Sequence, residues 1–134
     1  MKKSSHTNAY LQFLGISRSD ADLHGEEPLD ANHKALLETV ALHWYQGHPL
    51  SVVQTIDQAH LGSPATLHKR LARLIAQDFV TAQAGGVDRR TKWVKPTDKG
   101  LDYFHRLGMK MIKALVEENG RYKSEPEHLT DSTS

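Results

Sequence analysis

Small and basic side chains share one face of a helix that the sequence predicts over residues 64–77. Ser63 suits the N-cap, and Pro64 suits the first helical position, where its missing N–H costs nothing. The small side chains let this face approach another surface closely, and the polar ones can hydrogen-bond to base edges and phosphates of double-stranded DNA. We expect such contacts from Ser63, Ala65, Thr66, His68, Lys69, Arg70 and Arg73.

The position of each side chain on this helix indicates what it contacts. Thr66 and Lys69 lie opposite the apolar stripe and are expected to reach base edges, while Arg73 is expected to reach a base or a phosphate. His68 and Arg70 flank this face and are expected to contact phosphates. The alternative is a solvated helix face that happens to be basic.

A second basic cluster lies at the tip of a predicted β-hairpin, whose strands are expected at residues 79–84 and 91–95. The guanidinium of Arg89 or Arg90 can enter a narrow minor groove, where the potential is most negative. Asp88 is expected to order the turn and Lys92 to contact a phosphate. Here too the alternative is a solvated tip.

The elements that position these clusters follow one another in a recognisable order. A helix is expected from near Asp30, then a short helix over residues 52–59, a tight turn at 60–62, the helix over 64–77, the hairpin, and a last helix after Thr97. The short helix is expected to bury Val53 and Ile56, and the helix over 64–77 is expected to bury an apolar stripe of Leu67, Leu71, Leu74 and Ile75. Two short helices around a glycine-containing turn have the dimensions of a helix-turn-helix, and the hairpin after them is a wing.

Residues 29–116 resemble the winged-helix domain of the MarR family of transcription regulators. The similarity is carried by residues 50–71, by Asp78-Phe79-Val80, and by an Asp-x-Arg at Asp88-Arg89-Arg90 followed by Thr97-Asp98-Lys99-Gly100. The resemblance implies a mainly α fold with a small β-hairpin (α+β), which is a winged helix-turn-helix with flanking dimerisation helices. It also implies sequence-specific binding of double-stranded DNA by a homodimeric regulator, with Arg90 in the minor groove and Asp88 supporting it. Repression is favoured over activation, although the sequence does not distinguish the two.

Three regions are expected along the chain. Residues 1–28 are an N-terminal arm and linker, in which a short apolar turn over 9–14 is stopped by Gly15. Residues 29–118 form the DNA-binding domain with the C-terminal dimerisation helix, and residues 119–134 form a flexible polar tail.

The last helix carries an apolar stripe whose members lie three or four residues apart, as in a coiled-coil seam. Leu101 and Phe104 are expected to cover the core, whereas the later residues extend beyond what a small winged helix needs to bury. The sequence therefore predicts a homodimer with an interface formed by Tyr10, Phe13, Leu14, Phe104, Gly108, Met111, Ile112 and Leu115.

Composition excludes several classes of protein. The 134 residues carry a net charge of +1, and residues 61–100 hold eight basic and three acidic side chains, a distribution that favours polyanion binding. There is no Cys, and none of the nine His residues is paired at the spacing of a helical chelate, so we expect no metal and no cofactor. No catalytic motif is present, so no enzyme is expected. We expect a cytoplasmic protein without membrane contact, because there is no apolar run long enough to cross a bilayer.

Two other functions fit the same pattern. One is a winged helix that binds proteins and not DNA; the other is an accessory protein of plasmid or phage replication or partition that is not a transcription regulator. Basic side chains at positions 69, 73 and 90 disfavour the first. A small-molecule effector is compatible with the resemblance, but the sequence does not indicate its identity.

Overall fold

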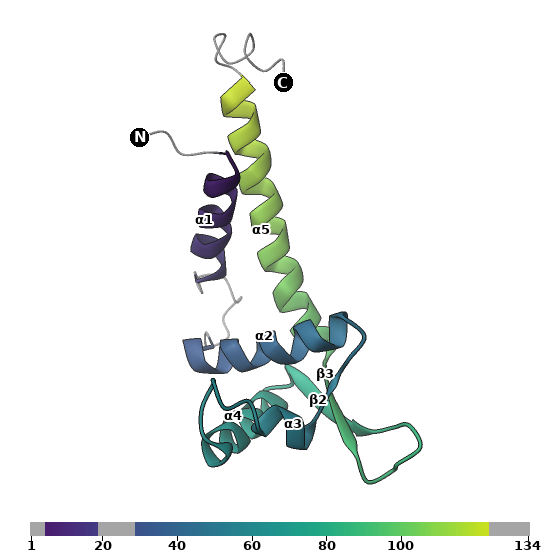
Figure 1. Ribbon diagram of the computed structural model, residues 1–134. Coiled ribbons are helices and arrows are strands. Elements are labelled where there is room, and N and C mark those ends of the chain that lie inside the picture. Colours follow the sequence, from purple (N-terminus) through teal and green to yellow (C-terminus); the bar gives the residue numbers. More distant parts are fainter. Residues whose placement is uncertain (1–4, 19–28, 124–134) are drawn as a thin grey trace. The chain divides into compact units, whose positions relative to one another are not determined.

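The computed structural model describes residues 5–18 and 29–123 (Figure 1). These residues divide into two compact units. We call residues 29–103 the winged unit, and residues 5–18 together with 104–123 the flanking unit. Helix α5 (Asp98–Lys123) contributes to both. None of the helices in the described ranges is long and apolar enough to span a membrane.

Helix α2 (Ala31–Tyr45) opens the winged unit and packs on α4 and on strand β3. The Asp30 carboxylate caps the helix by accepting the backbone N–H of His33, and the His33 ring Nδ1 lies 2.8 Å from the same oxygen. These hydrogen bonds hold the pKa of Asp30 below its usual value. The helix contributes three leucine and valine side chains to the core: Leu36, Leu37 and Val40.

Helix α3 (Val52–Ile56) is shorter than the predicted 52–59 and buries a different residue from the one expected. Its N-cap is a capping box, in which the Ser51 hydroxyl accepts the N–H of Gln54 and the Gln54 side chain accepts the N–H of Ser51. The sequence favoured Val53 for the core, but Val53 is 71% exposed and Thr55 is buried. Thr55 is accommodated because its hydroxyl donates to the Ser51 carbonyl at 2.8 Å.

Helix α4 (Pro64–Ala76) matches the predicted helix closely, with Ser63 as its N-cap. Leu67, Leu71 and Leu74 are buried as expected, while Ile75, predicted on the same stripe, is exposed. At the other end the chain turns through Asp78, whose φ of 65° is left-handed. The N–H of Phe79 donates to the Leu74 carbonyl and that of Asp78 to the Ile75 carbonyl, which is a Schellman motif.

The sheet contains one strand more than the predicted hairpin. Strands β2 (Val80–Ala84) and β3 (Lys92–Pro96) pair antiparallel, and β1 (Leu50–Ser51) adds to the other side of β3, giving the order β1-β3-β2. Ala82 and Leu50 both lie opposite Val94, which is buried completely. The central strand therefore joins the wing to the core under α2.

Gly100, in the first turn of α5, packs against the backbone of Phe79 in the winged unit. A Cβ at this position would lie 2.3 Å from the Phe79 carbonyl oxygen, so only glycine fits. Tyr103, one turn later, is buried and its ring meets that of Phe79 edge-on at 6.0 Å between centroids. Leu101 was expected to cover the core but is 37% exposed, because residues 100 and 103 occupy the inward face.

The flanking unit consists of α1 (Ser5–Ser17) and the part of α5 after Tyr103. Gly15 was expected to stop a short turn in a left-handed conformation, but it lies inside α1. The reason is that glycine is tolerated within a helix, and the apolar residues on either side of Gly15 continue the helical pattern. Helix α5 also runs further than expected, through residues 119–123. Residues 19–28 of the predicted linker and 124–134 of the predicted tail lie outside the described residues.

Candidate nucleic-acid interface

The outward face of α4 carries the small and basic side chains that the sequence placed there. Lys69, His68 and Arg73 are exposed, and so is Ala65 in the first turn. This exposure follows from the burial of the three leucines on the opposite side of the helix. The helix therefore presents a basic surface without a bulky residue between its charges, as readout of a major groove requires.

The first turn of α4 uses two of the predicted contact residues for capping. The Ser63 hydroxyl accepts the N–H of Thr66 at 3.2 Å and donates to the Thr66 hydroxyl oxygen at 2.9 Å. The methyl group of Thr66 lies 3.6 Å from the place that a Cβ would take at Gly62. Thr66 thus keeps its own hydroxyl proton for a DNA acceptor, but its methyl group is directed at the preceding turn.

Arg70 has a structural partner that the sequence did not reveal. Its side chain is half-buried, and Nη1 donates to the Leu61 carbonyl oxygen at 2.9 Å. The same nitrogen lies beside Gly62, 3.4 Å from where a Cβ of that residue would be. Arg70 therefore ties α4 to the turn before it. Its phosphate contact stays a prediction.

Asp88 organises the hairpin tip through the backbone. One carboxylate oxygen accepts the N–H of Arg90 at 2.9 Å, and the other accepts the Thr91 hydroxyl at 3.2 Å. The side chains of Arg89, Arg90 and Lys92 are exposed. An ordered backbone beneath exposed guanidinium groups is a suitable arrangement for entry into a groove, because less conformational freedom is lost on binding.

Trp93 supports the base of the same loop. Its indole N–H donates to the Gly85 carbonyl at 3.2 Å. The ring is half-buried, and its Cδ1 atom lies 3.5 Å from where a Cβ would be at Gly85. Trp93 therefore fixes strand β3 against the beginning of the loop that carries the arginines.

A group of residues that sequence reasoning did not select joins the end of α4 to the start of α5. Lys99 Nζ donates to the Gln77 carbonyl, the C-cap of α4, at 2.7 Å and lies 4.6 Å from the centre of the Phe79 ring. The Thr97 hydroxyl donates to the Asp78 carbonyl, and the Thr97 N–H donates to the Phe79 carbonyl at 3.0 Å. The only sequence signal for this junction was the Thr97-Asp98-Lys99-Gly100 motif. The junction sets where α4 ends relative to the strands of the wing.

The predicted interface residues of the flanking unit divide into two groups. Phe104, Gly108, Met111, Leu115 and Leu14 are half-buried. Ile112, Tyr10 and Phe13 are exposed, and three residues that the sequence did not select join them: Leu11, Met109 and Val116. On the part of α5 in the flanking unit, the exposed apolar side chains Met109, Ile112 and Val116 are spaced three and four apart, and Ile112 is the one that the predicted stripe shares with them.

Comparison with known proteins gives similarity to solved structures alone, since the sequence matches no protein-family model and no curated protein. The transcriptional regulator PA4135 is 20% identical, with a TM-score of 0.52 over 96% of this chain and 90% of that one. FabT from Streptococcus pneumoniae, solved in complex with DNA, is 19% identical, with a TM-score of 0.52 over 93% and 87% of the two chains. The regulator Tm0710 from Thermotoga maritima is 16% identical, with a TM-score of 0.51 over 87% and 71%.

The chain has a winged-helix fold. The fold class that the sequence predicted is thereby confirmed, including the hairpin wing and the helices that precede and follow the winged unit in the sequence. In this fold α4 occupies the position of the recognition helix, and the loop between β2 and β3 is the wing.

Proposed function

We propose that this protein is a homodimeric transcription regulator that binds specific double-stranded DNA and acts as a repressor. The observation that carries the proposal is the pairing, within one compact unit, of an exposed basic face on α4 with an ordered, arginine-bearing wing. In the proposed complex α4 enters the major groove and the wing reaches the adjacent minor groove. The fold shared with transcriptional regulators, one of them solved with DNA, supports this function.

The recognition helix supplies the base contacts in this proposal. Lys69 is exposed at the centre of the outward face and donates to guanine, the commonest acceptor for a basic side chain in the major groove. Thr66 donates its hydroxyl proton to a base acceptor, and Arg73 reaches a base or a phosphate. Arg70 orients the helix through Leu61 and adds charge near the phosphates.

The wing supplies the minor-groove contact. Because Asp88 binds the backbone N–H of Arg90, the side chain of Arg90 projects from an ordered turn. A narrow minor groove concentrates negative potential and attracts an arginine without requiring a unique base. Arg89 and Lys92, which are also exposed, add phosphate contacts at either side.

The flanking unit supplies the dimer. A row of exposed apolar side chains on α5 and a second group on α1 would be covered by the same surfaces of another copy. Gly108 has no side chain, and the space beside it is open in the single chain because a Cβ there would meet no atom within 4 Å, so the helix of a second copy could approach closely. A two-fold dimer binds two half-sites about one helical turn apart, so the operator is expected to be a pseudo-palindrome.

DNA selection with the purified full-length protein tests the proposal. Genomic fragments that it retains should share a pseudo-palindromic sequence, and the affinity should fall steeply between low and physiological salt. Placing that sequence across a promoter should lower transcription in vitro when the protein is added. Fragments without a common sequence, an affinity insensitive to salt, or unchanged transcription would contradict the respective part of the proposal.

Three variants separate the proposed contacts. Arg90→Ala should weaken operator binding by about 1–3 kcal/mol without lowering the melting temperature, because the side chain is exposed. Lys69→Ala should alter the preferred base at one position of each half-site. The matched control is Arg18→Ala, an exposed arginine of the flanking unit, which should leave the affinity within twofold. Equal losses for Arg90→Ala and Arg18→Ala would show that net charge alone drives binding.

A further inference from the structure

The loop between β2 and β3 carries one apolar side chain among charged ones. Val87 is 104% exposed, so the loop covers none of it. In Figure 1 this loop extends away from the helices of the winged unit. The exposed cations Arg89, Arg90 and Lys92 follow the valine closely. Isolated apolar residues are common on protein surfaces, but Val87 stands on an ordered and positively charged loop that is proposed to enter a groove of DNA.

A turn fixes the backbone on the C-terminal side of Val87. The N–H of Thr91 donates to the Asp88 carbonyl at 3.2 Å, which closes a β-turn with the two arginines at its central positions. The Asp88 carboxylate holds the same turn by accepting the N–H of Arg90 at 2.9 Å. Val87 therefore directly precedes an ordered turn that carries two positive charges.

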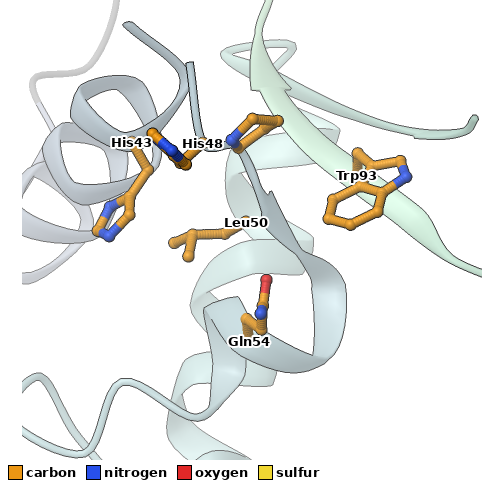
Figure 2. A pocket seen from close by; sticks show the side chains of 6 residues that line it. His43, His48, Leu50, Gln54 and Trp93 are labelled. Atoms are coloured by element: carbon orange, nitrogen blue, oxygen red, sulfur yellow. The ribbon is translucent and has the colours of Figure 1, made fainter. Parts of the chain in front are cut away.

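Trp93 fixes the backbone on the N-terminal side of the valine. Its ring projects from β3 beside a pocket of about 540 Å³ that also borders α2 and α3 (Figure 2). The indole N–H donates to the Gly85 carbonyl at 3.2 Å. Gly86 follows with a φ of 76°, a left-handed conformation in which a side chain would be strained. Because both ends of the loop are held, presenting Val87 to a partner costs little further conformational entropy.

We propose that Val87 enters the minor groove beside Arg90 and makes the wing prefer A·T to G·C base pairs, an inference that rests on the proposed binding of DNA. The cations beside the valine favour a polyanion as the partner that covers it, and apolar side chains are commonly inserted into the minor groove.

The preference follows from one chemical group in the groove. Both kinds of base pair present hydrogen-bond acceptors on its floor, but only G·C adds a donor, the guanine N2 amino group. The side chain of Val87 has no acceptor. At a G·C pair it would displace water from the amino group without replacing the hydrogen bond, which lowers the affinity. Arg90 responds to the potential of the groove, whereas Val87 responds to the amino group itself.

Operator duplexes that differ only in the minor groove test the proposal with the full-length protein. Inosine·cytosine lacks the guanine amino group but keeps the major-groove acceptors and donor of G·C, so α4 should not distinguish the two. Each pair that flanks the half-site contacted by α4 is replaced in turn by inosine·cytosine and by G·C. At one such position the wild type should bind the inosine duplex at least about fivefold more tightly. Val87→Ser should reduce this ratio at least about twofold, because a hydroxyl accepts from the amino group.

The matched control is Val53→Ser, which makes the same change at an exposed valine of α3 and should leave the ratio as in the wild type. The melting temperature should stay unchanged in both variants, because neither valine is buried. Equal wild-type affinity for the two duplexes at every position, a smaller fall of the ratio in Val87→Ser, or an equal fall in Val53→Ser overturns the inference alone. A wild-type protein that binds no operator duplex overturns the proposed function as well.

Discussion

The winged unit buries large apolar side chains in one core, whereas the flanking unit leaves a group of them exposed. In the winged unit the large residues of α2, α4 and the sheet converge on one core, where Leu36, Leu67 and Val94 are completely buried. In the flanking unit the side chains of Tyr10 and Ile112 are each 61% exposed, and they belong to groups of exposed apolar neighbours. The winged unit also exposes large apolar residues, among them Leu42, Trp44 and Tyr45 at the end of α2, but its core is closed without them.

This difference shows where the chain completes its own packing and where it does not. Full burial of a large apolar side chain contributes about 1.5–3 kcal/mol, so a stripe left in water forgoes several such contributions. The winged unit also closes its helix ends with caps and with the Lys99 junction. Covering the exposed apolar side chains of the flanking unit with a second copy would therefore contribute most to stability.

The largest expected effect comes from truncating the core of the winged unit. Leu67→Ala should lower the free energy of unfolding by about 3 kcal/mol, because the side chain is completely buried. Ile112→Ala should cost less than about 1 kcal/mol, since an exposed residue loses little on truncation. The cost of Ile112→Ala should also vanish on dilution below the dissociation constant of the dimer. Chemical denaturation at two protein concentrations measures both; a large, concentration-independent cost at Ile112 would contradict the comparison.

Substitution of two glycines of α5, one in each unit, is expected to have the next largest effect on stability. Gly100→Ala should lower the free energy of unfolding by about 2 kcal/mol, because the added Cβ would overlap the Phe79 carbonyl oxygen. Below the dissociation constant of the dimer, Gly108→Ala adds the same atom into open space and should raise helix stability by up to about 1 kcal/mol. Thermal unfolding of the two variants checks the opposite signs. Destabilisation of similar size in both would show that the flanking unit is packed as tightly as the winged unit.

The junction between α4 and α5 should give a smaller effect. Lys99→Met keeps the apolar stem but removes the hydrogen bond to Gln77 and the contact of the charge with the Phe79 ring. We expect a loss of about 1–2 kcal/mol. Lys95→Met, on the exposed side of β3, is the matched control and should change stability little. Equal melting temperatures for the two variants would contradict the claim that the contacts of Lys99 stabilise this junction.

The smallest expected effect is a gain in the free energy of unfolding. Asp78 holds the left-handed position that Gly47 holds at the end of α2, and a non-glycine residue is strained there. Asp78→Gly should therefore stabilise the winged unit by about 0.5–1 kcal/mol. Gly47→Asp should lose a similar amount by the same reasoning. Denaturation midpoints that move in the same direction for both variants would contradict it.

The elements that the sequence predicted well are those whose signals are local. Helix α4 has a cap, a proline at its first position and leucines at helical spacing, and the structure reproduces it almost residue by residue. Strand β1 has two residues, too few for any alternation, and it exists because it pairs with β3.

Errors arose where a distant or unexpected partner decided the outcome. Thr55 replaces Val53 in the core because its hydroxyl is satisfied by its own helix. The sequence also did not indicate that the Arg70 guanidinium donates to the Leu61 carbonyl, while its phosphate contact stays a prediction. The exposed row on α5 shares Ile112 with the predicted stripe but otherwise contains Met109 and Val116, since a pattern of period three and four does not indicate which of two adjacent faces is covered.

The oligomeric state tests the central claim most directly. Sedimentation equilibrium of the wild-type protein at micromolar concentration should give the mass of a dimer. Ile112→Glu should give a folded monomer, whereas Val53→Glu, which puts the same charge at a similarly exposed apolar position of the winged unit, should leave the dimer intact. A wild-type monomer, or equal dissociation by both variants, would contradict the claim that the flanking unit is completed by a second copy.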